Sequence, residues 1–225
     1  MNVRRWVIWV IALMPLLITL VVLPGMADMV PAHYGVNGMV DRYDSKYTMV
    51  LFPGIIIALV IFREVMPRRL GDDVAQQANI AVLDKIMLPL VLVLAGLNLL
   101  MVWLAYYQVE NIYTTSLNVP QLILAGLSLL FVLIGNLLPK TKPNPYVGIR
   151  VPWTLNHPEV WYKTHRIGGM VMTVWGVIGV MIAVFVSSPL VSAMAVVGGT
   201  VVMIGSIVLY AYVYHRQLMK RGAHE

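Results

Sequence analysis

The sequence contains no cysteine, so disulfide bonds, thiolate nucleophiles and cysteine-ligated metals play no part in it. Charged residues are also scarce: they make up 12% of the 225 residues, about half the share of a typical soluble domain. A His-Glu-x-x-His zinc motif, a glycine-rich phosphate loop and a Gly-x-Ser-x-Gly elbow are all missing. We therefore expect a protein that is not an enzyme, with no cofactor and no bound metal.

Hydrophobic residues, in contrast, make up 60% of the chain, and the mean hydropathy is +0.80. Lipid is the expected solvent, because a soluble protein of this composition would expose large apolar patches to water. Six uncharged runs approach the roughly 20 residues that a helix needs to cross a bilayer. They cover residues 6–23, 47–62, 86–106, 120–138, 168–186 and 190–213. The sequence therefore predicts an all-α integral membrane protein with six transmembrane helices.

The first run could instead be a secretory signal peptide, because Arg4 and Arg5 precede it and residues 25–27 resemble a weak cleavage site. The apolar core of a signal peptide is usually about 7 to 15 residues long. The run at 6–23 is longer, so we expect a retained transmembrane helix.

Lys and Arg residues are divided unevenly between alternate loops. Only Arg42 and Lys46 lie in the loop after the first span, and the other 14 of the 16 lie on the opposite side. Cytoplasmic loops carry the excess of cations, which predicts a multi-pass membrane protein with both termini in the cytoplasm. The net charge of +6 then reflects topology, and no nucleic acid is expected as a partner.

We divide the chain into residues 1–66, which include the outer loop 24–46, then residues 67–139 and residues 140–225. No ionisable residue lies within the six runs, which argues against an ion-coupled transporter or a proton relay. The polar residues Asn98, Gln121 and Asn136 are expected to form hydrogen bonds between helices.

The outer loop, residues 24–46, is too long for a passive connection. Its Asn37-Gly38 pair lies between short apolar segments, which is a strong signal for a β-hairpin with a type I′ turn. In that register Val36 faces Met39. A structured hairpin-like loop is therefore expected outside the cell.

A metal site built from His33, Asp41 and Asp44 would use ordinary zinc ligands. In the predicted register Tyr34 faces Asp41, whereas His33 lies with Arg42 on the other face of the hairpin. His33 is therefore interpreted as a polar anchor or as part of a binding surface. Asp41, Ser45 and Lys46 are expected to fasten the loop to the second helix.

A second informative segment follows the fourth span, at residues 146–169. Asn156 is predicted to cap a short interfacial helix, with Pro158 in its first turn and Glu159 completing a variant capping box. One face of that helix, directed at the membrane surface, would consist of Val160, Trp161, Thr164 and Ile167. Membrane-surface anchoring is the first interpretation of Arg150, Trp161 and His165. A docking face for a cytosolic partner, or a switch element, is the alternative.

These two loops carry a family resemblance. The motif at residues 31–38, with Asp41 and Ser45-Lys46, is similar to the extracellular motif of the amino-terminal domain found in the SdpI family. The second SdpI-like signature comprises residues 148–154, Val160-Trp161, Thr164-His165-Arg166 and Gly168-Gly169. With the six spans, the resemblance covers nearly the whole chain.

The resemblance implies a membrane immunity and signalling protein that binds or blocks a secreted peptide toxin and recruits a cytosolic transcriptional repressor. The implied outer ligand-binding residues are His33, Tyr34, Asn37, Gly38, Asp41, Ser45 and Lys46. The implied cytoplasmic partner or switch residues are Arg150, Pro152, Trp153, Thr154, Trp161, Thr164, His165 and Arg166. The alternative is a transporter or exporter of an amphipathic peptide or lipid that is not coupled to ions. The sequence makes no prediction of the oligomeric state.

Overall fold

The computed structural model describes residues 3–70, 74–115, 118–144 and 146–222, with the backbone alone for residues 66–70 and 74–76. The side chains of Arg68 and Arg69, which were counted in the charge pattern, lie outside the described part. Six of the described helices are long and apolar enough to cross a membrane, which confirms the predicted fold class of a multi-pass membrane protein. They are α1 Val3–Val22, α2 Leu51–Leu70, α3 Val74–Tyr106, α4 Val119–Leu137, α6 Pro158–Phe185 and α7 Pro189–Gly222.

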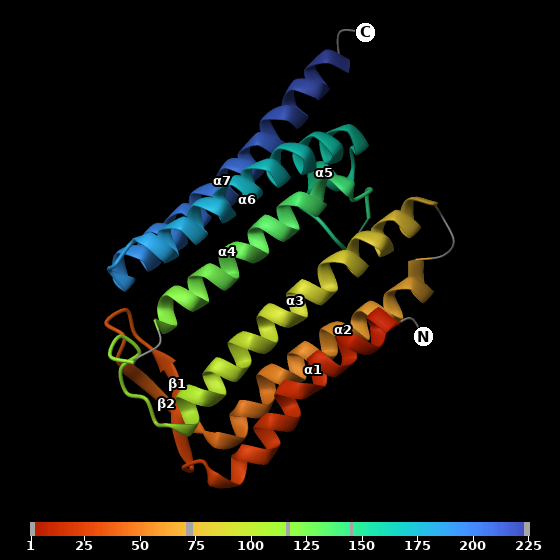
Figure 1. The fold of residues 1–225 in the computed structure, drawn as a ribbon. Coiled ribbons are helices and arrows are strands. Elements are labelled where there is room, and N and C mark those ends of the chain that lie inside the picture. Colours follow the sequence, from red (N-terminus) through yellow and green to blue (C-terminus); the bar gives the residue numbers. More distant parts are fainter. Residues whose placement is uncertain (1–2, 71–73, 116–117, 145, 223–225) are drawn as a thin grey trace.

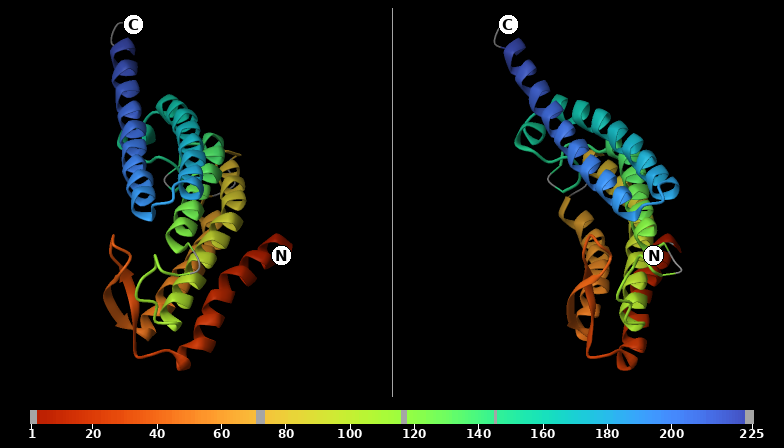
Figure 2. Two further views of the ribbon diagram at one scale, coloured as in Figure 1. Left: turned by 60° about the vertical axis from the view of Figure 1, so that its left-hand side comes forward. Right: turned by 90° about the vertical axis from the view of Figure 1, so that its left-hand side faces the viewer.

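The helices run roughly side by side, with α1 against α2 and α3, α4 against α3, and α6 packed between α4 and α7 (Figure 1). A two-stranded sheet covers one end of the bundle, here called the hairpin end. Both termini lie near the opposite end, here called the terminal end. The views in Figure 2 show α7 extending beyond the other helices there.

Three helices are longer than their predicted spans. α3, α6 and α7 contain 33, 28 and 34 residues. At about 1.5 Å per residue each exceeds the roughly 30 Å hydrocarbon core of a bilayer. Hydropathy detects only the part of a helix that faces lipid, so the polar ends of these helices were assigned to loops.

Close packing of α4 on α6 depends on glycine. A side-chain carbon added at Gly135 would lie 2.6 Å from the Gly169 carbonyl oxygen, and one added at Gly176 would lie 2.6 Å from the Ser128 carbonyl oxygen. Small residues allow such backbone approach between membrane helices. Gly179 of α6 also faces Ser128 of α4, and Gly199 of α7 faces Trp175 of α6.

The predicted interfacial helix is the beginning of α6, which starts at Pro158 and continues without a break to Phe185. Asn156 does not cap it. Asn156 ends the one-turn helix α5, Pro152–Leu155, and His157 precedes α6 without making a side-chain capping bond. The prediction failed because a short helix ends immediately before the long one begins.

The expected hairpin consists of β1, Met29–Tyr34, and β2, Val40–Ser45, in antiparallel pairing. Its turn is not type I′, because Gly38 has a φ of +76° while Asn37 does not have a positive φ. Gly35 and Gly38 donate to the carbonyl oxygens of Met39 and Gly35, respectively. This is a three-residue loop with a left-handed glycine.

The register also differs from the prediction, with one irregularity on each side of His33. His33 pairs with Arg42 as predicted, but Tyr34 pairs with Val40, so Asp41 is the extra residue on β2. A bulge re-aims the side chain of the unpaired residue. Asp41 therefore turns toward His33, which the regular register had placed on the other face.

Candidate functional site

The hairpin is held by the connection between α3 and α4. We call residues 107–115 of this connection the clamp segment. The Val40 N–H donates a 2.9 Å hydrogen bond to the Glu110 carbonyl oxygen, and the Ile112 N–H donates one of 2.9 Å to the Gly38 carbonyl oxygen. The clamp segment thus extends the sheet beside the turn, and no local sequence pattern had indicated this pairing.

Two tyrosine hydroxyls reinforce the clamp. Tyr34 donates to the Val109 carbonyl at 2.8 Å, and Tyr113 donates to the Val36 carbonyl at 2.7 Å. Burial, with a smaller contribution from Tyr43, raises the pKa of Tyr34 to about 12. Tyr34 therefore stays protonated and remains a hydrogen-bond donor at physiological pH.

His33 and Asp41 form the polar pair of the hairpin end. His33 Nδ1 donates to Asp41 Oδ1 at 2.6 Å, and both side chains are exposed. Asp44 instead lies 3.3 Å from the Arg42 guanidinium. No group of three His, Asp or Glu side chains gathers within the described ranges, so the proposed trio of His33, Asp41 and Asp44 is not assembled.

The other predicted outer residues have structural contacts. Asn37 Oδ1 accepts from the Met39 N–H at 3.1 Å and shapes the turn. Gly38 faces the Tyr113 ring so closely that a side chain would not fit. Lys46 is bound to Asp28 at 3.1 Å and to the Met26 carbonyl, so it fastens the start of the hairpin rather than helix α2. Ser45 is exposed.

An apolar groove of about 370 Å³ lies against the hairpin turn, between the first turns of α4 and α7. We call it the α4–α7 groove. Its walls are Tyr34, Gly35, Val36, Ile112, Tyr113, Pro120, Ile123, Leu124, Leu190, Ala193, Met194 and Val197. A second cavity of about 340 Å³ shares Tyr34, Ile112 and Ile123 with it. Ligand pockets have this size and apolar character, with a few polar groups at the edge.

At the terminal end, the predicted signature residues divide into a buried group and an exposed group. Trp161, Thr164, His165 and Thr154 are fully buried. The expectation that Trp161 and His165 anchor the membrane surface is therefore wrong. They also cannot form a docking face, since a partner could not reach them.

The buried group instead fixes the connection between α4 and α6. The Trp161 and His165 rings stack with centroids 4.0 Å apart. His165 Nε2 accepts from the Ile149 N–H at 2.9 Å, so its Nδ1 carries the proton and donates to the Trp161 carbonyl. Trp161 Nε1 donates to the Thr141 carbonyl at 3.2 Å. Thr154 Oγ1 donates to the Ile149 carbonyl at 2.7 Å.

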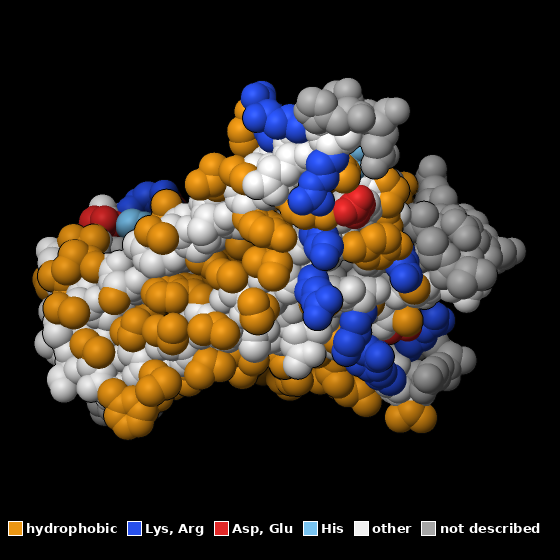
Figure 3. Space-filling view, turned by 90° about the horizontal axis from the view of Figure 1, so that it is seen from above, with side chains coloured by type: hydrophobic (Ala, Val, Ile, Leu, Met, Phe, Trp, Pro, Cys, Tyr) orange, Lys and Arg blue, Asp and Glu red, His pale blue; other side chains and the backbone are white. Residues whose placement is uncertain are grey.

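The exposed group consists of Arg150, Pro152 and Arg166, with Trp153 half-buried against the ring of Tyr212. These residues belong to a strongly basic region. In Figure 3 a band of Lys and Arg side chains crosses the molecule, and apolar surface covers the part toward the hairpin end. Exposed cations of this region are Lys140, Lys142, Arg150, Lys163, Arg166, Arg216 and Lys220.

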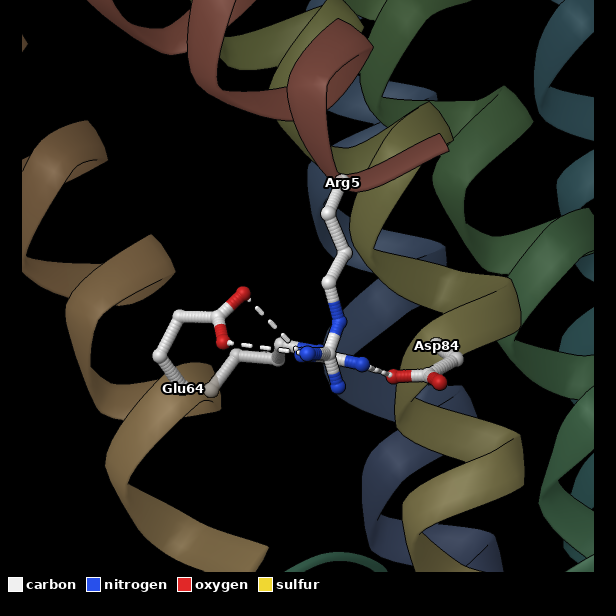
Figure 4. A network of polar contacts seen from close by, with 4 residues as sticks. Arg5, Glu64 and Asp84 are labelled. Carbon is white, nitrogen blue, oxygen red and sulfur yellow. Dashed lines mark hydrogen bonds and ion pairs between the residues drawn. The ribbon is translucent and has the colours of Figure 1, made fainter. Parts of the chain in front are cut away.

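One ionic network was missed because its residues had been assigned to loops. Arg63 of α2 is 4% exposed and donates to Asp84 of α3 and, at 3.0 Å, to Glu64. Arg5 of α1 lies 3.9 Å from Glu64 (Figure 4). These residues, Arg5 included, lie within the apolar helix ranges that could cross a membrane but outside the six uncharged runs of the sequence. The shortness of the second uncharged run was the one available signal.

The expected polar contacts inside the bundle are also incomplete. Asn98 is 2% exposed, and its Oδ1 has no hydrogen-bond partner among the described residues. Gln121 Oε1 is also buried and has no hydrogen-bond partner among the described residues. The prediction that these two groups are satisfied between helices is therefore wrong for these atoms.

Comparisons with known proteins match both ends of the chain. Residues 140–214 match the SdpI/YfhL protein family, and residues 10–57 match a domain of unknown function, DUF1648. The curated "Immunity protein SdpI" of Bacillus subtilis (strain 168) is 26% identical over 95 residues, which are 42% of this chain. They cover 46% of that protein, less than half of its length. No solved structure matches the chain. The motif resemblance is thereby confirmed: this membrane protein carries an SdpI/YfhL family segment behind an amino-terminal DUF1648 segment.

Proposed function

We propose that this chain is a membrane immunity protein that binds a secreted antimicrobial peptide at its hairpin end and keeps the peptide from damaging the bilayer. The observation that carries the proposal is the clamped hairpin beside the α4–α7 groove, which combines a polar rim with an apolar seat of about 370 Å³. The name of the Bacillus subtilis relative, an immunity protein, supports an immunity role.

The proposal requires the hairpin end to face the outside of a bacterial or archaeal cell and both termini to face the cytoplasm. Arg42 and Lys46 are the hairpin's only cations, whereas the terminal end is strongly basic. Because the chain has no native cysteine, Val36→Cys and Arg150→Cys can be labelled singly with a membrane-impermeant maleimide. We expect Val36→Cys to react on intact cells and Arg150→Cys only after permeabilisation. Labelling of both from one side would contradict the orientation.

The immunity role is tested in a strain that is sensitive to a peptide-secreting producer. Expression of the wild-type chain should protect the cells, and Ala193→Trp, which fills the groove, should abolish protection. Ala195→Trp is the matched control, because Ala195 is exposed on another face of α7. Equal protection by both variants would exclude the groove.

Protection also has to be separated from export. Inverted vesicles that contain the protein, with a labelled toxin added to the outside, report transport directly. Protection without transport supports binding. Energy-dependent uptake by these vesicles would instead support a peptide exporter.

We further propose that Arg150, Pro152, Trp153 and Arg166 contact a cytosolic transcriptional repressor. Arg150, Pro152 and Arg166 are exposed, and the two arginines supply positive charge, whereas the buried signature residues hold the surface in shape. Arg150→Ala with Arg166→Ala should weaken repressor capture and leave protection unchanged. Loss of both activities at unchanged protein level would contradict a separate cytoplasmic role.

A further inference from the structure

The hairpin end has the opposite charge to the rest of the molecule. Its outer segments, residues 24–46 and 107–115, contain the acidic residues Asp28, Asp41, Asp44 and Glu110. They contain only Arg42 and Lys46 as bases, so their net charge is −2 with His33 neutral, in a chain of net charge +6. The few residues that join α6 to α7 at this end are uncharged.

The two bases are already paired. Lys46 lies 3.1 Å from Asp28, and Arg42 lies 3.3 Å from Asp44. The unmatched negative charge therefore falls on Asp41 and Glu110. Asp41 Oδ1 is held by His33, whereas Glu110 forms no ion pair with any other residue that the structure describes.

Asp41 and Glu110 belong to segments that border the α4–α7 groove through Gly35 and Ile112. Asp41 Oδ2 would lie 3.3 Å from a carbon added at Gly35, which lines the groove. Glu110 belongs to the clamp segment, one residue from the Asn111 bridge to Met39 and two from the groove residue Ile112. A ligand seated in the groove would therefore have negative charge at its water-facing side.

The groove is shallow and apolar. On α7 its lining runs from Leu190 to Val197, which is about 10 Å of helix. Amphipathic helices that lie in the plane of a membrane interface bury their apolar face by roughly 5 to 10 Å. The depth thus fits a helix that lies on the bilayer rather than one that crosses it.

We propose that the groove binds a cationic amphipathic peptide helix that lies in the membrane interface, with its apolar side chains between α4 and α7 and its cations beside Asp41 and Glu110. This inference rests on the proposed immunity function and specifies its ligand. An anionic lipid headgroup fits poorly, because like charges at the rim repel it.

The binding test uses the full-length protein in phosphatidylcholine nanodiscs, with empty nanodiscs as background. The probes are fluorescent helical peptides of about 18 residues, one built from Leu and Lys, one from Leu and Glu, and one with the Leu/Lys composition scrambled to remove the apolar face. We expect the Leu/Lys helix to bind at least about tenfold more tightly than the other two, and salt to reduce the preference.

Charge variants locate the site. Asp41→Asn with Glu110→Gln should weaken binding of the Leu/Lys helix by about tenfold at low salt. Asp28→Asn makes the same kind of change on the same end, away from the groove, and should shift the affinity by less than about twofold. Equal binding of the Leu/Lys and Leu/Glu helices, or an equal loss in Asp28→Asn, overturns the inference.

Failure of the inference and failure of the proposed function look different. If cells are protected from a producer but the nanodiscs show no preference for the cationic helix, the proposed immunity function stands and the proposed ligand class is wrong. If the nanodiscs prefer the cationic helix but no cells are protected from any peptide producer, the binding site stands and the proposed immunity function is wrong.

Discussion

The Tyr113 hydroxyl donates a 2.7 Å hydrogen bond to the Val36 carbonyl, which joins the hairpin turn to the clamp segment between α3 and α4. The same ring lies against Gly38, so a small residue at the turn and an aromatic residue 75 positions later fit one another. The α4–α7 groove includes both Tyr113 and Val36 in its wall. The shape of the groove therefore depends on this contact.

Tyr113→Phe should loosen the turn without unfolding the bundle. The variant keeps the ring against Gly38 and removes only the hydroxyl, which contributes about 0.5 to 1.5 kcal/mol in a typical protein hydrogen bond. Hydrogen exchange at the amides of Gly38 and Val40 should become several-fold faster. Tyr146→Phe, an exposed tyrosine at the terminal end, is the control and should leave these rates unchanged.

The raised pKa of Tyr34 gives a pH prediction. The tyrosine pKa in an unfolded chain is about 10, and in the hairpin it is about 12 because of burial, followed by the effect of Tyr43. The contribution of Tyr34 to hairpin stability is therefore complete below pH 10 and is lost as the pH rises through 12. Absorbance at 295 nm, taken as wild type minus Tyr34→Phe, should show one tyrosine that ionises near pH 12. A midpoint near 10 would contradict burial of this hydroxyl.

Properties encoded along the chain were predictable from the sequence. Six helices follow from uncharged runs of sufficient length, and the hairpin follows from Asn37-Gly38 between apolar segments. The SdpI-like motif around Arg150 was recognisable because its residues are close in sequence. Each of these features depends on local pattern alone.

Features that depend on distant contacts were not predictable in this way. The bulge at Asp41 lies beside the contact between Val40 and the clamp segment near residue 110. No local sequence pattern predicts this contact. Trp161 and His165 carry polar atoms beside several cations, a pattern also typical of the headgroup layer. Their burial depends on contacts with Thr141 and Ile149, which lie 20 and 16 positions earlier in the chain. Arg63 appeared to be a loop cation because its partner Asp84 is 21 positions away.

Gly148→Ala should destabilise the signature loop strongly. Gly148 has a φ of +125°, and an added carbon would lie 3.0 Å from the Trp161 ring and closer still to His165. Backbone strain and overpacking together are expected to lower the unfolding free energy by about 2 to 4 kcal/mol. The measurement is the thermal unfolding midpoint in detergent.

The matched control is Gly96→Ala in α3, because a carbon added at Gly96 meets nothing within 4 Å. Alanine is favoured over glycine within a helix by about 0.5 to 1 kcal/mol. Gly96→Ala should therefore leave the midpoint unchanged or raise it. A similar fall in both variants would show that Gly148 is not constrained by the Trp161 and His165 pair.

Removing one member of the Arg63 and Asp84 pair should destabilise the protein, whereas replacing both with apolar residues should change its stability little. Asp84→Leu leaves the buried Arg63 guanidinium with Glu64 as its one remaining partner among its described contacts, and removing one partner of a buried pair destabilises by about 3 kcal/mol. Arg63→Met combined with Asp84→Leu removes both charges and should restore most of the thermal midpoint, because well-packed apolar residues often substitute for a buried pair without loss. Lys85→Gln, at the exposed neighbour of Asp84, should change the thermal midpoint little.

If the double variant were as unstable as Asp84→Leu alone, the attraction between the two charges would be holding α2 to α3. Recovery in the double variant would instead show that the pair is close to neutral for stability.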